Sequence, residues 1–314
     1  MSRSESSHGL RGEAMDRLDP EDTATGLVAL PCLDSEAHAQ RCQADLAVPR
    51  EQAARLGRSA LEAIERGVYV DRAGRPVDWG EAVTAAVAAK RSLPPDAALP
   101  SAPAPSRRET GVQVANETTL VAAKRLTETG ERVLALNFAN GIAPGGGFLH
   151  GARAQEEVLC RSSALYATLR GDPMYDAHRQ RTLPDSTDWA ILSPDVPVFR
   201  SDDGTPLDAH WPLSVITCAA PYAPGVGQPR AGDLLQQRIA RVLDIARTHG
   251  YTALVLGAWG CGAFGNDPHR TARDFHAALM RHAGAFAQVV FAVADWSPER
   301  RFLTPFALSF APTP

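Results

Sequence analysis

The feature that most constrains the fold is an alternation of short apolar runs with helix-like segments, which begins after a Pro/Ala-rich stretch at residues 94–109. Predicted strands occupy residues 111–115, 132–138, 189–193, 196–200, 214–220, 252–259 and 288–295. Predicted helices occupy residues 117–128, 156–169, 233–250 and 268–284. Strands that alternate with helices indicate an α/β domain, with a mixed or largely parallel sheet flanked by helices.

The chain before this alternation has a different character. Residues 1–48 are polar with weak periodicity, and we interpret them as a loosely ordered N-terminal extension. Residues 49–105 contain two helical patterns and the Pro/Ala-rich connector, and are interpreted as a helical accessory region. The catalytic domain is therefore expected at residues 106–314.

Charge and cysteine usage narrow the class of protein. The net charge of −4 provides no general basic field, so we expect no direct nucleic-acid binding, and a polyanionic ligand would have to be held locally. The five cysteines are scattered without a C-x-x-C pair, which fits a reducing cytoplasm and gives no zinc spacing. No apolar run approaches a membrane span, so no membrane partner is expected. Oligomeric state is left open.

Three glycine-rich loops follow predicted strands. They are residues 139–155, 220–230 and 257–267. Ligands of open α/β sheets bind beyond the carboxyl ends of the strands, so three such loops at one edge predict a ligand crevice. In the third loop Gly260, Gly262 and Gly265 spell G-x-G-x-x-G, the form of a dinucleotide-binding fingerprint. The next acid at a strand end, Asp295, lies beyond the expected spacing of about 20 residues, which weakens that alternative.

Two adjacent acids, Glu156 and Glu157, open the helix that follows the first loop. Acids in a first helical turn are favoured by the helix dipole alone, so ordinary capping is one interpretation. The triple glycine at 145–147 places the start of this helix at the predicted crevice. The other interpretation is therefore that one of the two carboxyls acts as a general acid on a bound sugar.

The stretch "GGGFLHGARAQEE" resembles the glycine-rich QEE signature of poly(ADP-ribose) glycohydrolases, specifically the short bacterial-type branch. The resemblance extends over roughly residues 50–300, through segments such as "NETTLVAAKRL", "LNFAN", "ITCAAP" and "GAWGCGAFGN". It implies a macrodomain fold with a helical N-terminal accessory region and an ADP-ribose pocket at this edge of the sheet. The chain departs from the family at Ala143, where an asparagine is common, while Asn140 is similar to an asparagine of the broader macrodomain motif.

The resemblance also implies roles for individual residues. Glu157 would be the catalytic acid and base, Glu156 would hold ribose hydroxyls, and Gln155 would orient the pair. Glu117 and Thr118 resemble the pair of macrodomain residues that contacts adenine. The remaining residues expected to bind substrate lie in the first and third loops: Asn140, Gly145, Gly146, Gly147 and Phe148, and then Gly260, Cys261, Gly262, Ala263, Phe264, Gly265 and Asn266.

The activity implied by the resemblance is hydrolysis of the ribose–ribose glycosidic bonds of ADP-ribose polymers, free or attached to protein, without a cofactor. His269, His276 and His282 lack zinc spacing, so no metal is expected. Two alternatives stay open: a reader that binds ADP-ribose without cutting it, and a hydrolase of single ADP-ribosyl modifications.

Overall fold

An eight-stranded sheet organises the computed structural model, which describes residues 26–107 and 109–311. The strand order is β1-β5-β10-β9-β6-β8-β7-β4. The strands span Gly26–Ala29 (β1), Arg91–Leu93 (β4), Glu109–Ala115 (β5), Val133–Ala139 (β6), Ala190–Arg200 (β7), Pro206–Ala219 (β8), Ala253–Leu256 (β9) and Gln288–Ala292 (β10). A separate hairpin pairs Val68–Val70 (β2) with Pro76–Asp78 (β3).

The sheet is mostly parallel, as the sequence pattern predicts. Strands β1, β5, β10, β9, β6 and β8 are joined by parallel pairings, and the antiparallel pairings described within this sheet are those of β7 with β8 and with β4. Parallel β6, β8 and β9 therefore end at the same edge, and the three glycine-rich loops emerge there together. This is the edge at which α/β sheets bind ligands.

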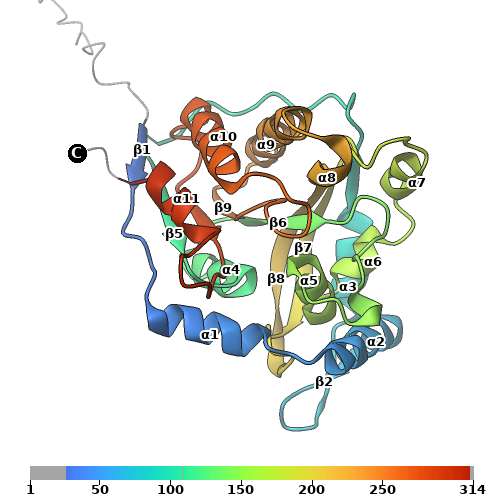
Figure 1. Cartoon of the computed structure of the whole chain (residues 1–314). Helices are drawn as coiled ribbons and strands as arrows, with labels where there is room; N and C mark the ends of the chain where they lie inside the picture. The colour runs from blue at the N-terminus through green and yellow to red at the C-terminus, as the bar shows by residue number, and fades with distance from the viewer. Residues whose placement is uncertain (1–25, 108, 312–314) are drawn as a thin grey trace, which may run out of the picture.

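Helices cover both faces of the sheet (Figure 1). The helices of the chain span Glu36–Leu46 (α1), Arg50–Arg66 (α2), Gly80–Ala89 (α3), Thr119–Thr127 (α4), Gln155–Ser162 (α5), Leu165–Leu169 (α6), Pro173–Arg179 (α7), Ala223–Val226 (α8), Arg230–Thr248 (α9), Pro268–Arg281 (α10) and Leu303–Ser309 (α11). One apolar core lies between the sheet and α2 to α7, and the other lies between the sheet and α9 to α11.

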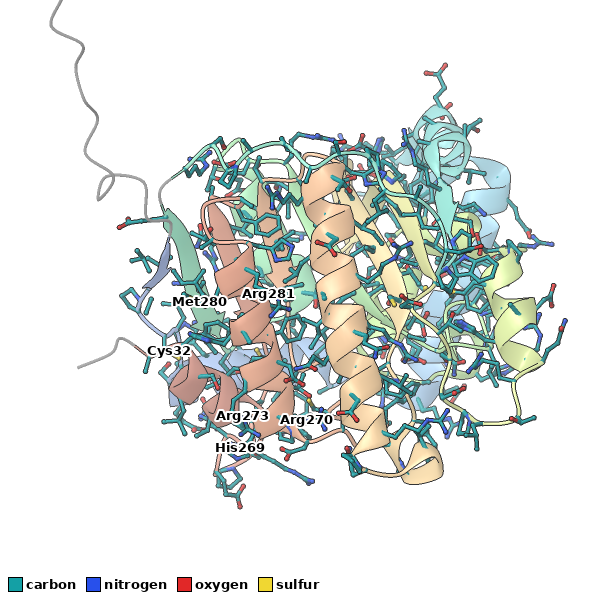
Figure 2. The ribbon with its side chains drawn as sticks, turned by 90° about the horizontal axis from the view of Figure 1, so that it is seen from above. Cys32, His269, Arg270, Arg273, Met280 and Arg281 are labelled. Carbon is teal, nitrogen blue, oxygen red and sulfur yellow. The ribbon has the colours of Figure 1, made fainter. Side chains whose placement is uncertain are left out.

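Helices α9 and α10 lie side by side on the second face (Figure 2). Arg270 of α10 reaches the neighbouring helix, and its Nη2 donates a hydrogen bond to Asp233 Oδ1 at 2.5 Å. Asp267 caps the N-terminus of α10 by accepting from the His269 N–H, so this helix begins immediately after the third glycine-rich loop. The helix start thereby fixes the position of that loop at the ligand edge.

The interpretation of residues 1–48 as loosely ordered is wrong for its second half. β1 pairs with β5 as an edge strand, and Cys42 of α1 is buried and donates through Sγ to the Asn116 carbonyl at 3.3 Å. Sequence periodicity misses α1 because its apolar face is made of small residues such as Ala39 and Cys42. Residues 1–25, the other part of that prediction, lie outside the described residues.

Two further features depart from the sequence prediction. The helix expected over 156–169 breaks into α5 and α6, because Ser163 forms a bridge with Val198 and the Ala164 N–H donates to the Pro197 carbonyl. The strands expected at 189–193 and 196–200 form one continuous strand, β7. The boundary predicted at residue 105 stays a prediction, although β4, which precedes it, joins the main sheet.

Candidate active site

A cavity of about 570 Å³ opens at the carboxyl edge of the sheet. Its wall takes residues from the ends of β5, β6 and β9, from the N-terminus of α5, and from the segment after β10. Both acids of the QEE signature line it, together with Gln155 and Asn140. The size suits a small organic ligand, because such sites in proteins are typically about 300–1,000 Å³.

The loop after β6 holds Glu156 against the end of that strand. The Asn140 N–H donates to Glu156 Oε2 at 2.7 Å, and Asn137 Nδ2 donates to Oε1 at 3.3 Å. Asn140 Oδ1 in turn accepts from the N–H groups of Ile142 and Ala143, both at 3.0 Å, which closes a tight turn. This turn leaves Glu156 only 3% exposed. Asn140 therefore fixes an acid through its backbone and shapes the loop through its side chain.

The triple glycine lies directly against the two carboxyls. The Gly147 N–H donates to Glu157 Oε1 at 3.0 Å. Gly146 has φ +57°, and a Cβ on it would lie 2.3 Å from Glu157 Oε1 and 3.1 Å from Glu156 Oε2. Glycine is thus required at 146 both for the left-handed backbone and for the close approach of the acids. The expected contacts of Gly145, Gly146 and Gly147 with a ligand stay predictions, since none of the three lines the cavity wall.

Glu157 differs from its neighbour in how its two oxygens are used. One oxygen, Oε1, is held by the glycine loop, whereas the buried Oε2 has no hydrogen-bond partner among the described residues. A buried polar atom is normally satisfied, so this exception calls for an explanation in function. Since Glu157 lines the cavity, we expect a bound ligand to supply the partner of Oε2.

Gln155 ties the start of α5 to strand β6. Its Oε1 accepts from the Phe138 N–H at 2.9 Å, and its Nε2 donates to the Leu136 carbonyl at 2.7 Å. A further contact joins Nε2 to Thr119 Oγ1 at 3.2 Å. These partners agree with the orienting role that the resemblance implies, because they set the rotation of the helix that carries both acids.

The third glycine-rich loop borders the cavity with residues whose backbone amides are not used by the fold. Gly262, Ala263 and Phe264 line it, and within the described chain their N–H groups make no hydrogen bond to protein. Gly260 and Gly265, with φ +74° and +66°, turn the chain on either side. Successive unpaired N–H groups form a concave anion site, and the start of α10 follows directly. The loop is therefore suited to a phosphate or diphosphate.

Glu117 and Thr118 lie at another part of the same wall. The Glu117 carboxylate is paired with Arg125 at 2.5 Å. Thr118 caps α4 by accepting from the Val121 N–H at 3.2 Å, and its hydroxyl donates to Asp202 Oδ2 at 2.7 Å. Both residues are thus held in place by hydrogen bonds, so the contact with adenine that the resemblance implies would require little rearrangement.

Besides the triple glycine, four more residues expected to bind substrate do not line the cavity: Phe148, Cys261, Gly265 and Asn266. Phe148 is 2% exposed and packs against Tyr166, with ring centroids 4.9 Å apart. Cys261 and Asn266 are buried, and Asn266 Nδ2 donates to the carbonyls of Pro221 and Gly260. Packing and hydrogen bonding inside the fold thus already use the side chains of Phe148, Cys261 and Asn266, and the expected contacts of these three residues and of Gly265 with a ligand stay predictions.

The structure adds wall residues that sequence reasoning missed: Leu46, Arg153, Asp202, Trp296 and Phe302. Trp296 follows Asp295, which accepts from the backbone N–H groups of Phe302 and Leu303 and so folds this segment over the cavity. The sequence could have indicated Trp296 as a cavity residue, because it comes directly after the last predicted strand, at the edge where a ligand was expected. Leu46 and Asp202 gave no such signal, since α1 and the β7–β8 connection reach the site only in three dimensions.

The charges at the site are unevenly distributed. Burial raises the pKa of Glu156 to about 8, and the nearby Glu157 carboxylate adds to this, although the hydrogen bond from the Asn140 N–H opposes it. Burial also raises the pKa of Asp202 to about 6. Near pH 7 Glu156 is therefore neutral in the folded protein, so the adjacent acids need not carry two negative charges beside an anionic ligand.

This pKa predicts a pH-dependent stability. Between about pH 4.5, the ordinary Glu value, and pH 8 the folded protein holds a proton on Glu156 that the unfolded chain releases. The free energy of unfolding should thus fall as pH rises through this window, by up to roughly 1.4 kcal/mol per unit. Glu156→Gln removes that slope, so the variant should gain stability relative to wild type toward pH 8. Denaturant unfolding at pH 5 and pH 8 measures this, with exposed Glu65→Gln as control. Parallel curves for wild type and Glu156→Gln would contradict the assignment.

Comparison with known proteins agrees with this geometry. The family "Microbial-type PARG, catalytic domain" matches residues 57–201, where PARG is poly(ADP-ribose) glycohydrolase. A solved structure of this enzyme from Thermomonospora curvata is 42% identical, covers 82% of this chain and 99% of its own, and superposes with a TM-score of 0.76. The chain belongs to the bacterial poly(ADP-ribose) glycohydrolase family. The match spans nearly all of the solved enzyme, so membership applies to the whole domain and not to an isolated motif.

Other members of the family have been solved with ligands. The Thermomonospora curvata glycohydrolase bound to the inhibitor ADP-HPD is 40% identical, with a TM-score of 0.75, and covers 82% of this chain and 99% of its own. The glycohydrolase from Deinococcus radiodurans in complex with ADP-ribose is 40% identical, with a TM-score of 0.65, and covers 73% of this chain and 97% of its own. No curated protein matches the chain. The described helices include none long and apolar enough to cross a membrane.

Proposed function

We infer that this protein is a poly(ADP-ribose) glycohydrolase, which hydrolyses the ribose–ribose glycosidic bonds of ADP-ribose polymers. The observation that supports this is the presence of two features in one cavity: an acid with one oxygen held by the glycine loop and one that has no partner among residues 26–107 and 109–311, and a loop whose three backbone amides have no partner there either. The first suits proton transfer to a sugar oxygen, and the second suits a diphosphate. Family membership supports the same conclusion.

The ligand is proposed to lie along the carboxyl edge of the sheet. Its diphosphate would accept hydrogen bonds from the N–H groups of Gly262, Ala263 and Phe264. The distal ribose would then reach Glu156 and Glu157 at the start of α5, while the base would lie toward Glu117 and Thr118. All of these residues line the cavity, so the placement needs no change of fold.

Glu157 is proposed as the acid and base of the reaction. Glu157 is proposed to take up a proton at Oε2 once the anionic ligand is bound. This proton passes to the 2′ oxygen of the departing ribose as the bond between that oxygen and the anomeric carbon breaks, which leaves an oxocarbenium-like sugar. Glu157, now a carboxylate, takes a proton from water as the water oxygen bonds to the anomeric carbon. Glu156, held by the Asn140 N–H, is proposed to orient ribose hydroxyls. The two steps together return Glu157 to its protonated form.

The substrate is proposed to be the polymer itself, free or attached to protein. The cytoplasmic location predicted from the scattered cysteines stays a prediction. A reader that binds ADP-ribose without cutting it would use the same amide loop. Glu157 Oε2, which has no hydrogen-bond partner among the described residues, favours the enzyme, because binding alone gives no reason to bury a carboxyl oxygen without a partner.

The proposal predicts that free ADP-ribose stabilises the protein. At about 100 times its Kd, a ligand that binds only the folded state adds about 2.7 kcal/mol to the free energy of unfolding. Thermal unfolding with ADP-ribose should show this, and AMP, which lacks the second phosphate and distal ribose, should give a smaller shift. Incubation with authentic polymer should release ADP-ribose. Binding without release would favour the reader, and reduction of NAD with a dehydrogenase substrate would restore the dinucleotide alternative.

A further inference from the structure

A histidine outside the cavity contacts the loop that holds the acids. His178 belongs to α7, a short helix that sequence periodicity did not predict, and it is 3% exposed. Its Nδ1 lies 3.0 Å from the carbonyl oxygen of Gly141, in the connection between β6 and α5. None of the steps proposed above uses this side chain, so its burial against the loop needs an explanation of its own.

The partners of His178 define its tautomer. The Thr187 N–H donates to Nε2 at 3.1 Å, and the Thr187 hydroxyl lies 2.8 Å from the same nitrogen. A nitrogen that accepts from a backbone N–H carries no proton, so the ring proton of a neutral imidazole is on Nδ1. Burial lowers the pKa of His178, which favours the neutral ring. Nδ1–H therefore donates to the Gly141 carbonyl.

This hydrogen bond lies one residue from the amide that binds Glu156. Gly141 directly follows Asn140, whose N–H donates to Glu156 Oε2 at 2.7 Å. Gly141 is closely enclosed, because a Cβ there would lie 2.3 Å from Ser186 Oγ, 3.2 Å from the Ala219 Cβ and 3.4 Å from His178 Nδ1 itself. The Gly141 carbonyl is thus fixed among close neighbours, and a shift of this carbonyl would displace the backbone N–H of the adjoining Asn140.

We propose that His178 is a positioning residue for the acid pair: its Nδ1–H fixes the Gly141 carbonyl and, through it, the Asn140 amide that holds Glu156. This rests on the proposed function, since the acids matter only if the protein cuts its ligand. A neighbouring hydrogen bond also holds this loop, because Arg179 Nη1 donates to the Ile142 carbonyl. α7 is thereby a brace for the loop of the active site.

Two isosteric variants separate positioning from packing. In His178→Asn the side-chain amide reaches the Nδ1 position and can still donate to Gly141, whereas in His178→Gln it reaches the Nε2 position and meets Thr187 instead. Both should lower the melting temperature by similar amounts. His178→Gln should lower kcat by roughly 10- to 100-fold, because small misplacements of catalytic groups have effects of that size. KM should change by less than about 3-fold, and His178→Asn should keep kcat about 10-fold above that of His178→Gln.

Hydrogen exchange gives a second readout that does not depend on turnover. The peptide covering residues 139–147 should exchange faster in His178→Gln than in His178→Asn, with exposed Gln180→Ala as a control equal to wild type. If both isosteres fail to fold, exposed Arg179→Ala tests the same brace, with faster exchange and lower kcat expected. Equal kcat and equal exchange in the two isosteres would overturn the proposal. A wild type that releases no ADP-ribose would instead overturn the proposed function, while the exchange comparison would still decide the role of His178.

Discussion

Glu157→Gln should lower the turnover of ADP-ribose polymer by about 10²–10⁴-fold, the usual contribution of a general acid and base. The amide keeps the size of the side chain, and its oxygen still accepts from the Gly147 N–H, so the fold and the glycine loop should be preserved. What is lost is the transferable proton on the oxygen that has no partner within the described structure. ADP-ribose affinity should change by less than about 3-fold, because the amides proposed to hold the diphosphate lie in another loop.

Glu156→Gln is the matched control for that variant. It changes the neighbouring acid on the same helical turn, and Glu156 is already neutral near pH 7. Its turnover should fall less, with some loss of ADP-ribose affinity if the residue holds ribose hydroxyls. If the two acids only cap α5, both variants should lose a few tenths of a kcal/mol of stability and keep full activity. Polymer turnover and ADP-ribose affinity measured for both variants decide between these outcomes, and a fully active Glu157→Gln protein would refute the catalytic assignment.

Gly146→Ala should reduce turnover by about 10²-fold or more. The new Cβ would lie 2.3 Å from Glu157 Oε1 and 3.1 Å from Glu156 Oε2, so both carboxyls must move. A displacement of catalytic groups by about 1 Å is enough for an effect of this size. The left-handed backbone at φ +57° adds a penalty of roughly 1–2 kcal/mol in stability.

Gly130→Ala separates the clash from the backbone penalty. Gly130 has φ +80°, and a Cβ there would meet no atom within 4 Å. This variant should lose a similar amount of stability and keep its turnover. Polymer hydrolysis and thermal unfolding of the two variants provide the measurement. Equal turnover in Gly146→Ala and Gly130→Ala would show that the close approach of the glycine to the acids has no part in the reaction.

The sequence by itself determined the class of fold, the edge that carries the site, and the acids at its centre. Strand and helix periodicities are local properties, and they placed β6, β8 and β9 with their glycine-rich loops. Because parallel strands share one carboxyl edge, the meeting of those loops followed without coordinates. The QEE signature then named Glu156 and Glu157, and the cavity contains both.

Only the tertiary structure decided which groups complete the site and which merely support it. Leu46 and Asp202 reach the cavity from segments far from the glycine loops, and Phe148 turns inward although it follows the triple glycine. The two acids have different hydrogen-bond partners: Glu156 is buried between amide donors, whereas one oxygen of Glu157 has no partner in the part of the chain that the structure describes. This difference depends on distances between loops. Local patterns record the propensity of a segment and the face it buries, whereas burial, pKa and hydrogen-bond partners arise from the packing of segments that are distant in sequence.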